Sequence, residues 1–287
     1  MTNSNYAIKH DLQHSRHQLT QQLINNYFKT KKNDMKKKTL FVAFSTQKGG
    51  VGKTTFTVLA ASYLHYLKGY NVAVLDCDFP QYSINAMRKR DTQQVETDDY
   101  YKLMAYNQFK QLNKKAYPII CSSPEEAIAS ANSFLATSDI EFDLVLFDLP
   151  GTMNSVGILQ SLANMDYIFT PIIADRLVLE SSLSFALSVN ELLVNNSSLR
   201  LKELHLFWNQ VDGREKTDLY EIYEKSIHEF GLPLLHTFIP DTKRYNKELS
   251  GSRKPVFRST LFPADKRLIK GSNLEELLIE IAHIIKL

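Results

Sequence analysis

The feature that most constrains this chain is a glycine-rich loop, residues 45–55, between an apolar and an amphipathic run. The apolar run 40–44 predicts a strand and the amphipathic run 56–66 predicts a helix, which is the context a phosphate-binding loop needs. Glycines let backbone amides turn inward without a Cβ in the way, and these amides then face an anion with the helix N-terminus. Lys53 can reach the outer phosphates, and the Thr54 hydroxyl can ligate Mg²⁺. The stretch therefore predicts a site for a phosphorylated ligand and a magnesium ion.

The loop also carries a second lysine at its head. Gln47 stands where the general phosphate-binding loop has glycine, and Lys48 follows it. The pattern Lys-Gly-Gly-Val-Gly-Lys-Thr-Thr resembles the deviant Walker A motif of the ParA/MinD ATPases. The resemblance implies ATP and Mg²⁺ as cofactors and a homodimer in which Lys48 crosses the interface to the other subunit's ATP, so that Lys48 and Lys53 are catalytic. The nucleotide contacts implied in this loop are Lys48, Gly49, Gly50, Val51, Gly52, Lys53, Thr54 and Thr55.

Carboxylates end two further apolar runs, at the edge where ligands bind in parallel sheets. Asp76 and Asp78 follow the first run, and Asp148 ends the second. By resemblance to the same family, Asp76 and Asp148 belong with Thr54 to the magnesium site, Asp148 being the Walker B carboxylate. The resemblance also implies that Asp78 orients the attacking water. Phe79 departs from the family's Asp-x-Asp-Pro-Gln segment by standing before the proline.

Later segments complete the predicted nucleotide site. Gly151 stands in a switch-type loop, 149–152, where the family often has proline, and glycine adds hinge freedom there. Asn209 ends a strand-like run and resembles the base-contacting Asn of P-loop NTPases, with a plain strand-end cap as the alternative. The sequence Asn-Gln-Val-Asp at this point also resembles a guanine-reading motif, which leaves GTP as an alternative nucleotide. Pro240, which ends a predicted late strand 234–240, would lie beside the adenine.

Units of strand, loop and helix recur along the chain, with further strands predicted at 117–122 and 166–173. This alternation predicts one α/β domain, 39–287, built on a doubly wound, mostly parallel sheet with helices on both faces. Residues 84–115 read as helical and charged. The last helix, 274–285, is amphipathic, but it carries glutamates that an anionic bilayer would repel, so we expect it to pack on the sheet.

Residues 1–38 read as a basic, polar extension, disordered or partly helical, with a DNA-binding or partner-binding arm as the alternative. Met35 is an alternative natural start, because such chains often begin just before the first strand. No run of about 18 apolar residues is present, so no membrane span is expected. The N-terminus lacks the apolar region of a secretory signal, and two cysteines give no disulfide framework. We therefore expect a cytoplasmic protein.

The net charge is only +3, but it is unevenly spread. Residues 1–38 hold eight Lys/Arg against two Asp/Glu, and residues 243–270 hold nine against two. Two basic zones beside an acidic body favour a polyanion as partner. In proteins that resemble ParA, basic residues in this later part bind nonspecific double-stranded DNA, for which charge at tolerable spacing suffices. The candidate DNA contacts are Lys243, Arg244, Lys247, Arg253, Lys254, Arg258, Lys266, Arg267 and Lys270.

These features together predict a ParA-like ATPase that dimerises around ATP, binds DNA and partitions a plasmid, chromosome or conjugative element. Hydrolysis should be slow until a ParB-like partner stimulates it, and the protein should associate with the nucleoid. One alternative is an ATP-switched regulator of transfer or transcription genes that uses residues 1–34. Another is a MinD-like positioning protein on the membrane, which the acidic last helix disfavours. The lack of paired cysteines argues against iron-protein reductases and cluster carriers.

Overall fold

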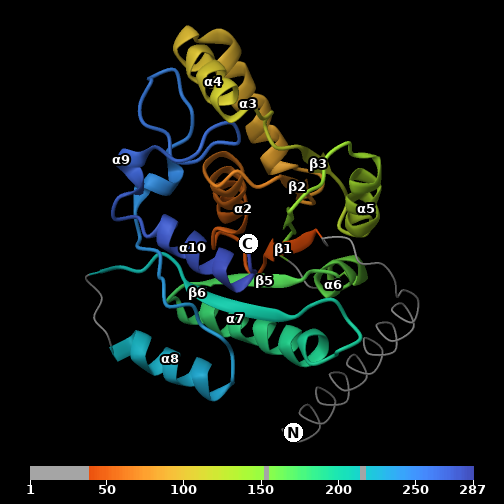
Figure 1. Ribbon diagram of the computed structural model, residues 1–287. Coiled ribbons are helices and arrows are strands. Elements are labelled where there is room, and N and C mark those ends of the chain that lie inside the picture. The colour runs from red at the N-terminus through yellow and green to blue at the C-terminus, as the bar shows by residue number, and fades with distance from the viewer. Residues whose placement is uncertain (1–38, 152–154, 214–217) are drawn as a thin grey trace, which may run out of the picture.

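The computed structural model describes residues 39–151, 155–213 and 218–287 (Figure 1). The predicted extension 1–38 lies outside these residues, as does position 152 of the predicted switch loop. Within the described residues, six strands form one sheet in the order β3-β2-β4-β1-β5-β6, and every neighbouring pair is parallel, which confirms the predicted sheet. The strands are β1 Leu40–Phe44, β2 Val72–Asp76, β3 Ile119–Cys121, β4 Leu144–Asp148, β5 Tyr167–Ile172 and β6 Glu203–Trp208.

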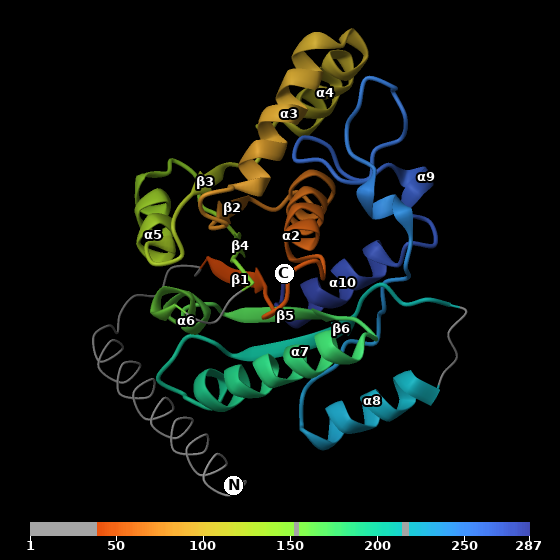
Figure 2. The ribbon, with the colours of Figure 1, turned by 180° about the vertical axis from the view of Figure 1, so that it is seen from behind.

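Helices cover both faces of this sheet, as predicted (Figure 1, Figure 2). One face carries α2 Lys53–Ser62, α3 Ser83–Thr97 and α10 Leu274–Ile284, and the other carries α5 Ala127–Thr137, α6 Val156–Ala163, α7 Arg176–Val189 and α8 Asp218–Glu229. The region 84–115 is helical, as predicted, and it forms two helices, α3 and α4 Asp99–Leu112. The break occurs because Asp98 adopts an extended backbone, and its side chain caps α4 by accepting the Tyr100 amide at 2.9 Å. A short helix, α9 Lys266–Ile269, precedes α10.

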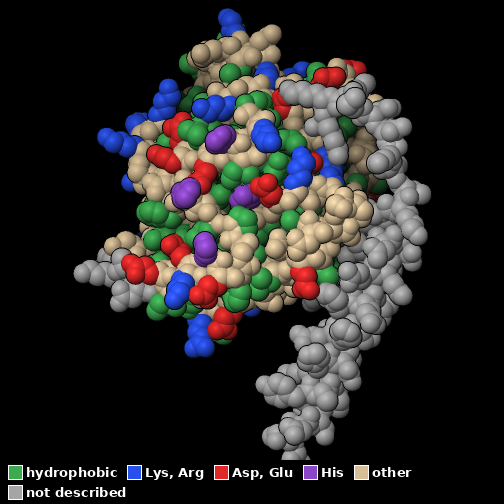
Figure 3. All heavy atoms as spheres, turned by 60° about the horizontal axis from the view of Figure 1, so that its bottom comes forward, with side chains coloured by type: hydrophobic (Ala, Val, Ile, Leu, Met, Phe, Trp, Pro, Cys, Tyr) green, Lys and Arg blue, Asp and Glu red, His purple; other side chains and the backbone are tan. Residues whose placement is uncertain are grey.

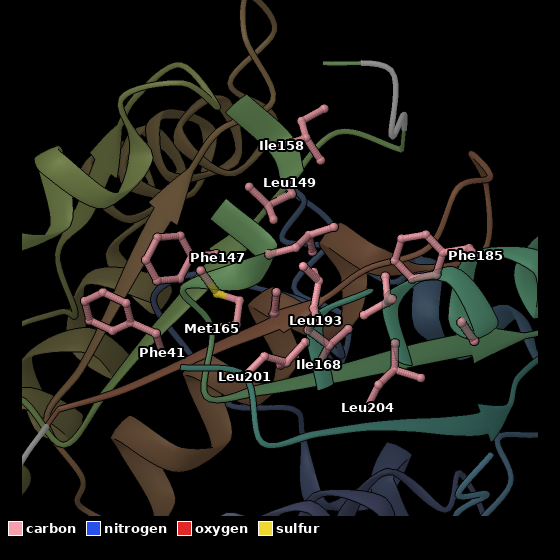
Figure 4. Packing of buried hydrophobic residues seen from close by; sticks show 14 of the residues in the cluster. Phe41, Phe147, Leu149, Ile158, Met165, Ile168, Phe185, Leu193, Leu201 and Leu204 are labelled. Carbon is pink, nitrogen blue, oxygen red and sulfur yellow. The ribbon is translucent and has the colours of Figure 1, made fainter. Parts of the chain in front are cut away.

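The strands are apolar throughout because both faces of the sheet are buried. Successive residues of β1 point to opposite faces, so Phe41 joins one core cluster while Val42 and Phe44 join the other. Figure 4 shows the first cluster, to which the sheet contributes Phe41 and Ile168 and α7 contributes Phe185. Burying a side chain of this size contributes about 1.5–3 kcal/mol. The two clusters fix the strands in place. The starting points of the loops at the C-terminal ends of the strands are therefore fixed as well.

The late strand predicted over 234–240 is wrong. This segment runs beside β6, but it forms only the isolated bridges Leu206↔Leu234 and Val211↔Pro240. The amides in its middle turn away from the sheet, because those of residues 236 and 237 donate to the two carboxylate oxygens of Glu280 at 2.8 and 3.0 Å. The amides of Leu235 and Ile239 still donate to β6 carbonyls at 2.8 Å each, but the amides of residues 236 and 237 between them go to α10, so no continuous strand pairing forms.

The helix α10 packs on the sheet, as predicted. Leu277, Leu278 and Ile281 are buried in the cluster that also holds α2. On the other face, α7 continues through a π-helical turn to form a helix of 19 residues, Arg176–Val194, with a mean hydropathy of 1.5. By length and composition this helix could cross a membrane, although no span was expected from the sequence. Its buried residues, Phe185 among them, cover the sheet, as a core helix does.

Candidate nucleotide site

The glycine loop joins β1 to α2 at the C-terminal edge of the sheet. Gly50 and Gly52 have backbone φ angles of 77° and 97°, which side-chain-bearing residues rarely adopt. At Gly52 a Cβ would also lie 3.0 Å from the Phe56 ring and 3.1 Å from Asn209 Nδ2. The first hydrogen bond of α2 runs from the Phe56 amide to the Gly52 carbonyl, so the amides of residues 53–55 remain free for a ligand. This geometry suits the anion site that the sequence predicts.

The two lysines of the loop have different environments. Lys53 Nζ donates to the Lys48 carbonyl at 2.9 Å, and burial lowers the pKa of Lys53 although Asp148 and Asp78 nearby act to raise it. The Lys48 side chain is exposed, and no hydrogen bond or ion pair to another described residue is found for its amine. Gly151 packs against both lysine residues, because a Cβ there would lie 2.8 Å from Lys53 Nζ and 3.2 Å from the Lys48 carbonyl oxygen. Its φ is not in the left-handed region, so close packing is the structural reason for a glycine here.

Thr54 and Asp148 come together as a magnesium site requires. Thr54 Oγ1 donates to Asp148 Oδ2 at 2.8 Å, and Asp148 Oδ1 is buried with no hydrogen-bond partner among the described residues. Burial raises the pKa of Asp148 to about 7. A hydroxyl and a carboxylate with a free oxygen suit Mg²⁺, which prefers oxygen ligands. Asp76 pairs with Asp148 in register, but its Oδ2 accepts the Asn85 amide at 2.9 Å, and burial raises its pKa.

Asp78 lies in the connection between β2 and α3 and is half-buried. Its Oδ2 accepts a hydrogen bond from Ser83 Oγ at 2.9 Å, which orients the carboxylate. Its negative charge also acts to raise the pKa of Lys53, so the carboxylate that is predicted to orient the water lies near the Lys53 amine. Ser83 was not identified from the sequence, because a serine that opens a helix gives no signal of a contact to a neighbouring carboxylate.

Asn209 braces the glycine loop. Its Nδ2 donates to the Val51 carbonyl at 2.9 Å, and the next residue, Gln210, reaches the Gly50 carbonyl at 3.4 Å. The amide of Asn209 therefore holds the phosphate loop to the end of β6. Beside it lies a cavity of about 150 Å³, whose lining includes Gly52, Thr55, Phe56, Pro240 and Tyr245. Pro240 thus lines a cavity next to the loop, where a nucleotide base would be expected. Phe56 and Tyr245 line the same cavity, but they were not identified from the sequence because they read as ordinary core residues.

The nine candidate DNA residues fall into two groups. The five lysines are exposed, and their side-chain amines have no hydrogen bond or ion pair with other described residues: Lys243, Lys247, Lys254, Lys266 and Lys270. The arginines are all engaged within the protein. The bonds are Arg244 to the Lys270 carbonyl at 2.6 Å, Arg253 to Asp98 at 2.9 Å, Arg258 to Glu248 at 2.6 Å and Arg267 to Asp265 at 2.7 Å. On the face that Figure 3 shows, positive, negative and histidine side chains are interspersed over the described residues in view.

Comparison with known proteins agrees with this geometry. The model of the CobQ/CobB/MinD/ParA nucleotide-binding domain family matches residues 42–256, which is most of the chain. The chain belongs to this family. Its glycine loop is therefore part of a nucleotide-binding domain of the CobQ/CobB/MinD/ParA type. No curated protein matches the chain.

Solved structures share the fold at low identity. A plasmid partition protein from Borrelia burgdorferi is 17% identical, with a TM-score of 0.52 over 85% of this chain and 99% of that one. A ParA family ATPase from Chlorobium tepidum is 14% identical, with a TM-score of 0.53 over 86% and 99%. A second Borrelia burgdorferi chain, described as a plasmid partition protein and bound to AMPPNP, is 20% identical, with a TM-score of 0.55 over 84% and 98%.

Proposed function

We propose that this protein hydrolyses ATP, forms a homodimer around ATP and binds nonspecific DNA to partition a plasmid, chromosome or conjugative element. The observation that carries the proposal is the contrast between the two loop lysines. Lys53 folds back onto the loop, while the Lys48 amine points to solvent beside it with no partner among the described residues of its own subunit. A lysine so placed is available to a phosphate held by a second copy. The partition proteins among the solved neighbours support the same role.

The chain's own residues supply positioning and charge. The free amides of residues 53–55 bind the phosphate oxygens, and Lys53 neutralises charge on the outer phosphate. Bound through Thr54 and Asp148, Mg²⁺ would neutralise charge that develops on the phosphates. Asp78, held by Ser83, orients the attacking water, and Lys48 of the second subunit adds a positive charge where the transition state becomes negative. Hydrolysis stays slow until a ParB-like partner acts.

The dimer is tested by measuring molar mass with ADP and with a non-hydrolysable ATP analogue. The wild type should double its mass only with the analogue, and Lys48→Ala should remain monomeric. Lys89→Ala, which removes an exposed lysine from α3, is the matched control and should behave as wild type. Unchanged pairing and turnover in Lys48→Ala would falsify the shared-phosphate arrangement.

DNA binding is assigned to the five exposed lysines that have no partner, since the arginines of the same stretch are engaged within the protein. Lys254→Glu and Lys270→Glu should each weaken retention on duplex DNA in the presence of the ATP analogue. Removing one phosphate-binding lysine should also lower the salt slope by about 0.9. Lys225→Glu on α8 makes the same charge change elsewhere and should have no effect. Equal losses in all three variants would show that net charge, not this surface, sets the binding.

Localisation on the nucleoid follows from this proposal and would be seen by microscopy of a fluorescent fusion. The regulator hypothesis depends on residues 1–34, which lie outside the described residues, and their deletion separates it from the partition role. A MinD-like membrane role is disfavoured because the apolar face of α10 is buried, with Leu277 and Ile281 in the core. Flotation of the protein with ATP on anionic liposomes would favour the membrane role over the partition role.

A further inference from the structure

Arg258 comes from the basic C-terminal stretch but lies at the glycine loop. Its Nη1 donates to Thr55 Oγ1 at 2.5 Å, across 203 residues of sequence. Its Nη2 donates to Glu248 Oε1 at 2.6 Å, and its Nε is buried with no hydrogen-bond partner among the described residues. The side chain is 19% exposed. A charged donor that is buried and incompletely satisfied is unusual, and it marks a place where an acceptor is expected.

The position of Thr55 indicates that a phosphate oxygen is the expected acceptor. Thr55 is the third residue of α2, so its amide is one of the free donors that face the anion site. Thr55 also lines the cavity beside the loop. A guanidinium bonded to the Thr55 hydroxyl therefore stands at the edge of the phosphate site, and guanidinium groups bind phosphate oxygens in pairs of parallel hydrogen bonds.

We propose that Arg258 is a nucleotide-binding residue, whose guanidinium turns from Glu248 to the phosphate chain when nucleotide binds and so links the nucleotide to the loop 247–258. This inference rests on the proposed nucleotide site, and it removes Arg258 from the DNA surface. The sequence placed it there on charge alone. In the structure its charge faces the glycine loop.

The backbone around Arg258 links a movement of its guanidinium to the loop 247–258. The Lys247 carbonyl accepts the amides of both Phe257 and Arg258, at 2.8 and 3.0 Å, and this closes the base of the loop 247–258. Glu248 is the next residue in that loop, so the Arg258–Glu248 pair is a second tie across the base. Breaking the pair leaves the loop held at one point fewer.

The far end of the same loop contacts the helical hairpin α3–α4. Arg253 pairs with Asp98 at 2.9 Å, and the Tyr101 hydroxyl donates to the Ser250 carbonyl at 3.0 Å. Figure 1 shows this part of the chain rising beside α9 toward α4. Lys247 and Lys254, two of the exposed lysines, belong to the loop, so a change at its base moves part of the DNA surface.

The residues just after Arg258 are held by hydrogen bonds and cannot shift when the Arg258 side chain moves. Asp91 Oδ2 accepts the Ser259 hydroxyl at 3.0 Å and the Thr260 amide at 2.7 Å. The Ser259 carbonyl in turn accepts the Ser62 hydroxyl of α2 at 2.7 Å. The segment is thus fixed to α2 and α3 on its C-terminal side, and any displacement at Arg258 passes to the N-terminal side, toward Glu248.

The test measures ADP affinity by calorimetry and amide hydrogen exchange of residues 247–258 on the full-length protein. Arg258→Gln should weaken ADP binding about tenfold, because it removes a charge-assisted hydrogen bond. Arg258→Lys should restore part of the loss. Arg253→Gln is the matched control, since it removes an arginine from the same loop, and it should leave ADP affinity unchanged. In the wild type, exchange in 247–258 should rise on ADP binding, and in Arg258→Gln this response should disappear.

Two results would overturn the proposal: ADP affinity within about twofold of wild type in Arg258→Gln, or an undiminished exchange response. If Arg258→Gln does not fold, Glu248→Gln serves instead. It leaves the arginine in place without its counter-charge, and ADP should then bind more tightly, whereas unchanged or weaker binding refutes the idea. These measurements use ADP without DNA, so they stand even if the protein proves not to dimerise or to retain DNA.

Discussion

Asp148→Asn should make the nucleotide-free protein more stable at neutral pH while it destroys the magnesium site. Burial raises the pKa of Asp148 from 3.8 to about 7, so the folded protein binds a proton there that the unfolded chain does not hold above about pH 4. Stability therefore falls as pH rises between these values, by about 1.4 kcal/mol per pH unit. At about pH 8 the carboxylate costs the fold about 4 kcal/mol, and at about pH 5 about 1.5 kcal/mol.

Asparagine does not titrate, so the variant escapes this penalty, and its advantage over wild type should widen by about 3 kcal/mol from about pH 5 to about pH 8. Urea unfolding of both proteins in EDTA at the two pH values measures the difference. Asp139→Asn changes an exposed carboxylate and should track wild type. A gap that stays constant with pH, or narrows toward pH 8, refutes the reasoning about burial. The same variant should lose magnesium-dependent nucleotide binding, because Asp148 Oδ1 is the free oxygen of the site.

Other substitutions test the loop and its supports. Gly151→Ala places a Cβ 2.8 Å from Lys53 Nζ, so ADP affinity should fall about tenfold while the melting temperature changes little. Asn209→Ala removes the bond from Nδ2 to the Val51 carbonyl and should cost about 1–3 kcal/mol in urea unfolding, with weaker ADP binding. Asp91→Ala leaves its hydrogen-bond donors unsatisfied and should cost about 3 kcal/mol or more, read from the same unfolding curves.

The sheet could be predicted because fully buried parallel strands leave continuous apolar runs, and the glycine loop could be predicted because phosphate binding fixes residue types at short spacing. Thr54 and Asp148 could both be singled out because each belongs to a recognisable segment, and the structure joins them by a hydrogen bond across 94 residues. The break at Asp98 was missed, because a capping aspartate inside a charged helix looks like any other surface residue. The false strand over 234–240 arose because apolar content does not reveal where backbone amides point.

Contacts between distant segments without a motif set the limit of sequence reading. Arg258 and Thr55 are 203 residues apart, and Arg253 and Asp98 are 155 apart, and neither pair leaves a local pattern. Gly151 was assigned hinge freedom from its residue type, whereas the structure shows that a close neighbour, Lys53 Nζ, explains it better. A residue type limits what a position can do, but only its surroundings decide among those uses.

The basic stretch shows the same point for charge. Counting charges gave nine equivalent candidates, but the structure separates lysines from arginines, and the chemistry of the two side chains explains the division. The planar guanidinium presents donors in a fixed fork that suits carboxylates and carbonyls, so arginines are readily used to join loops within a fold. The ammonium of lysine is a strongly hydrated point charge that is left in solvent at less cost. A basic patch that is meant to meet a polyanion is therefore better judged by its lysines and by arginines without acidic neighbours than by net charge.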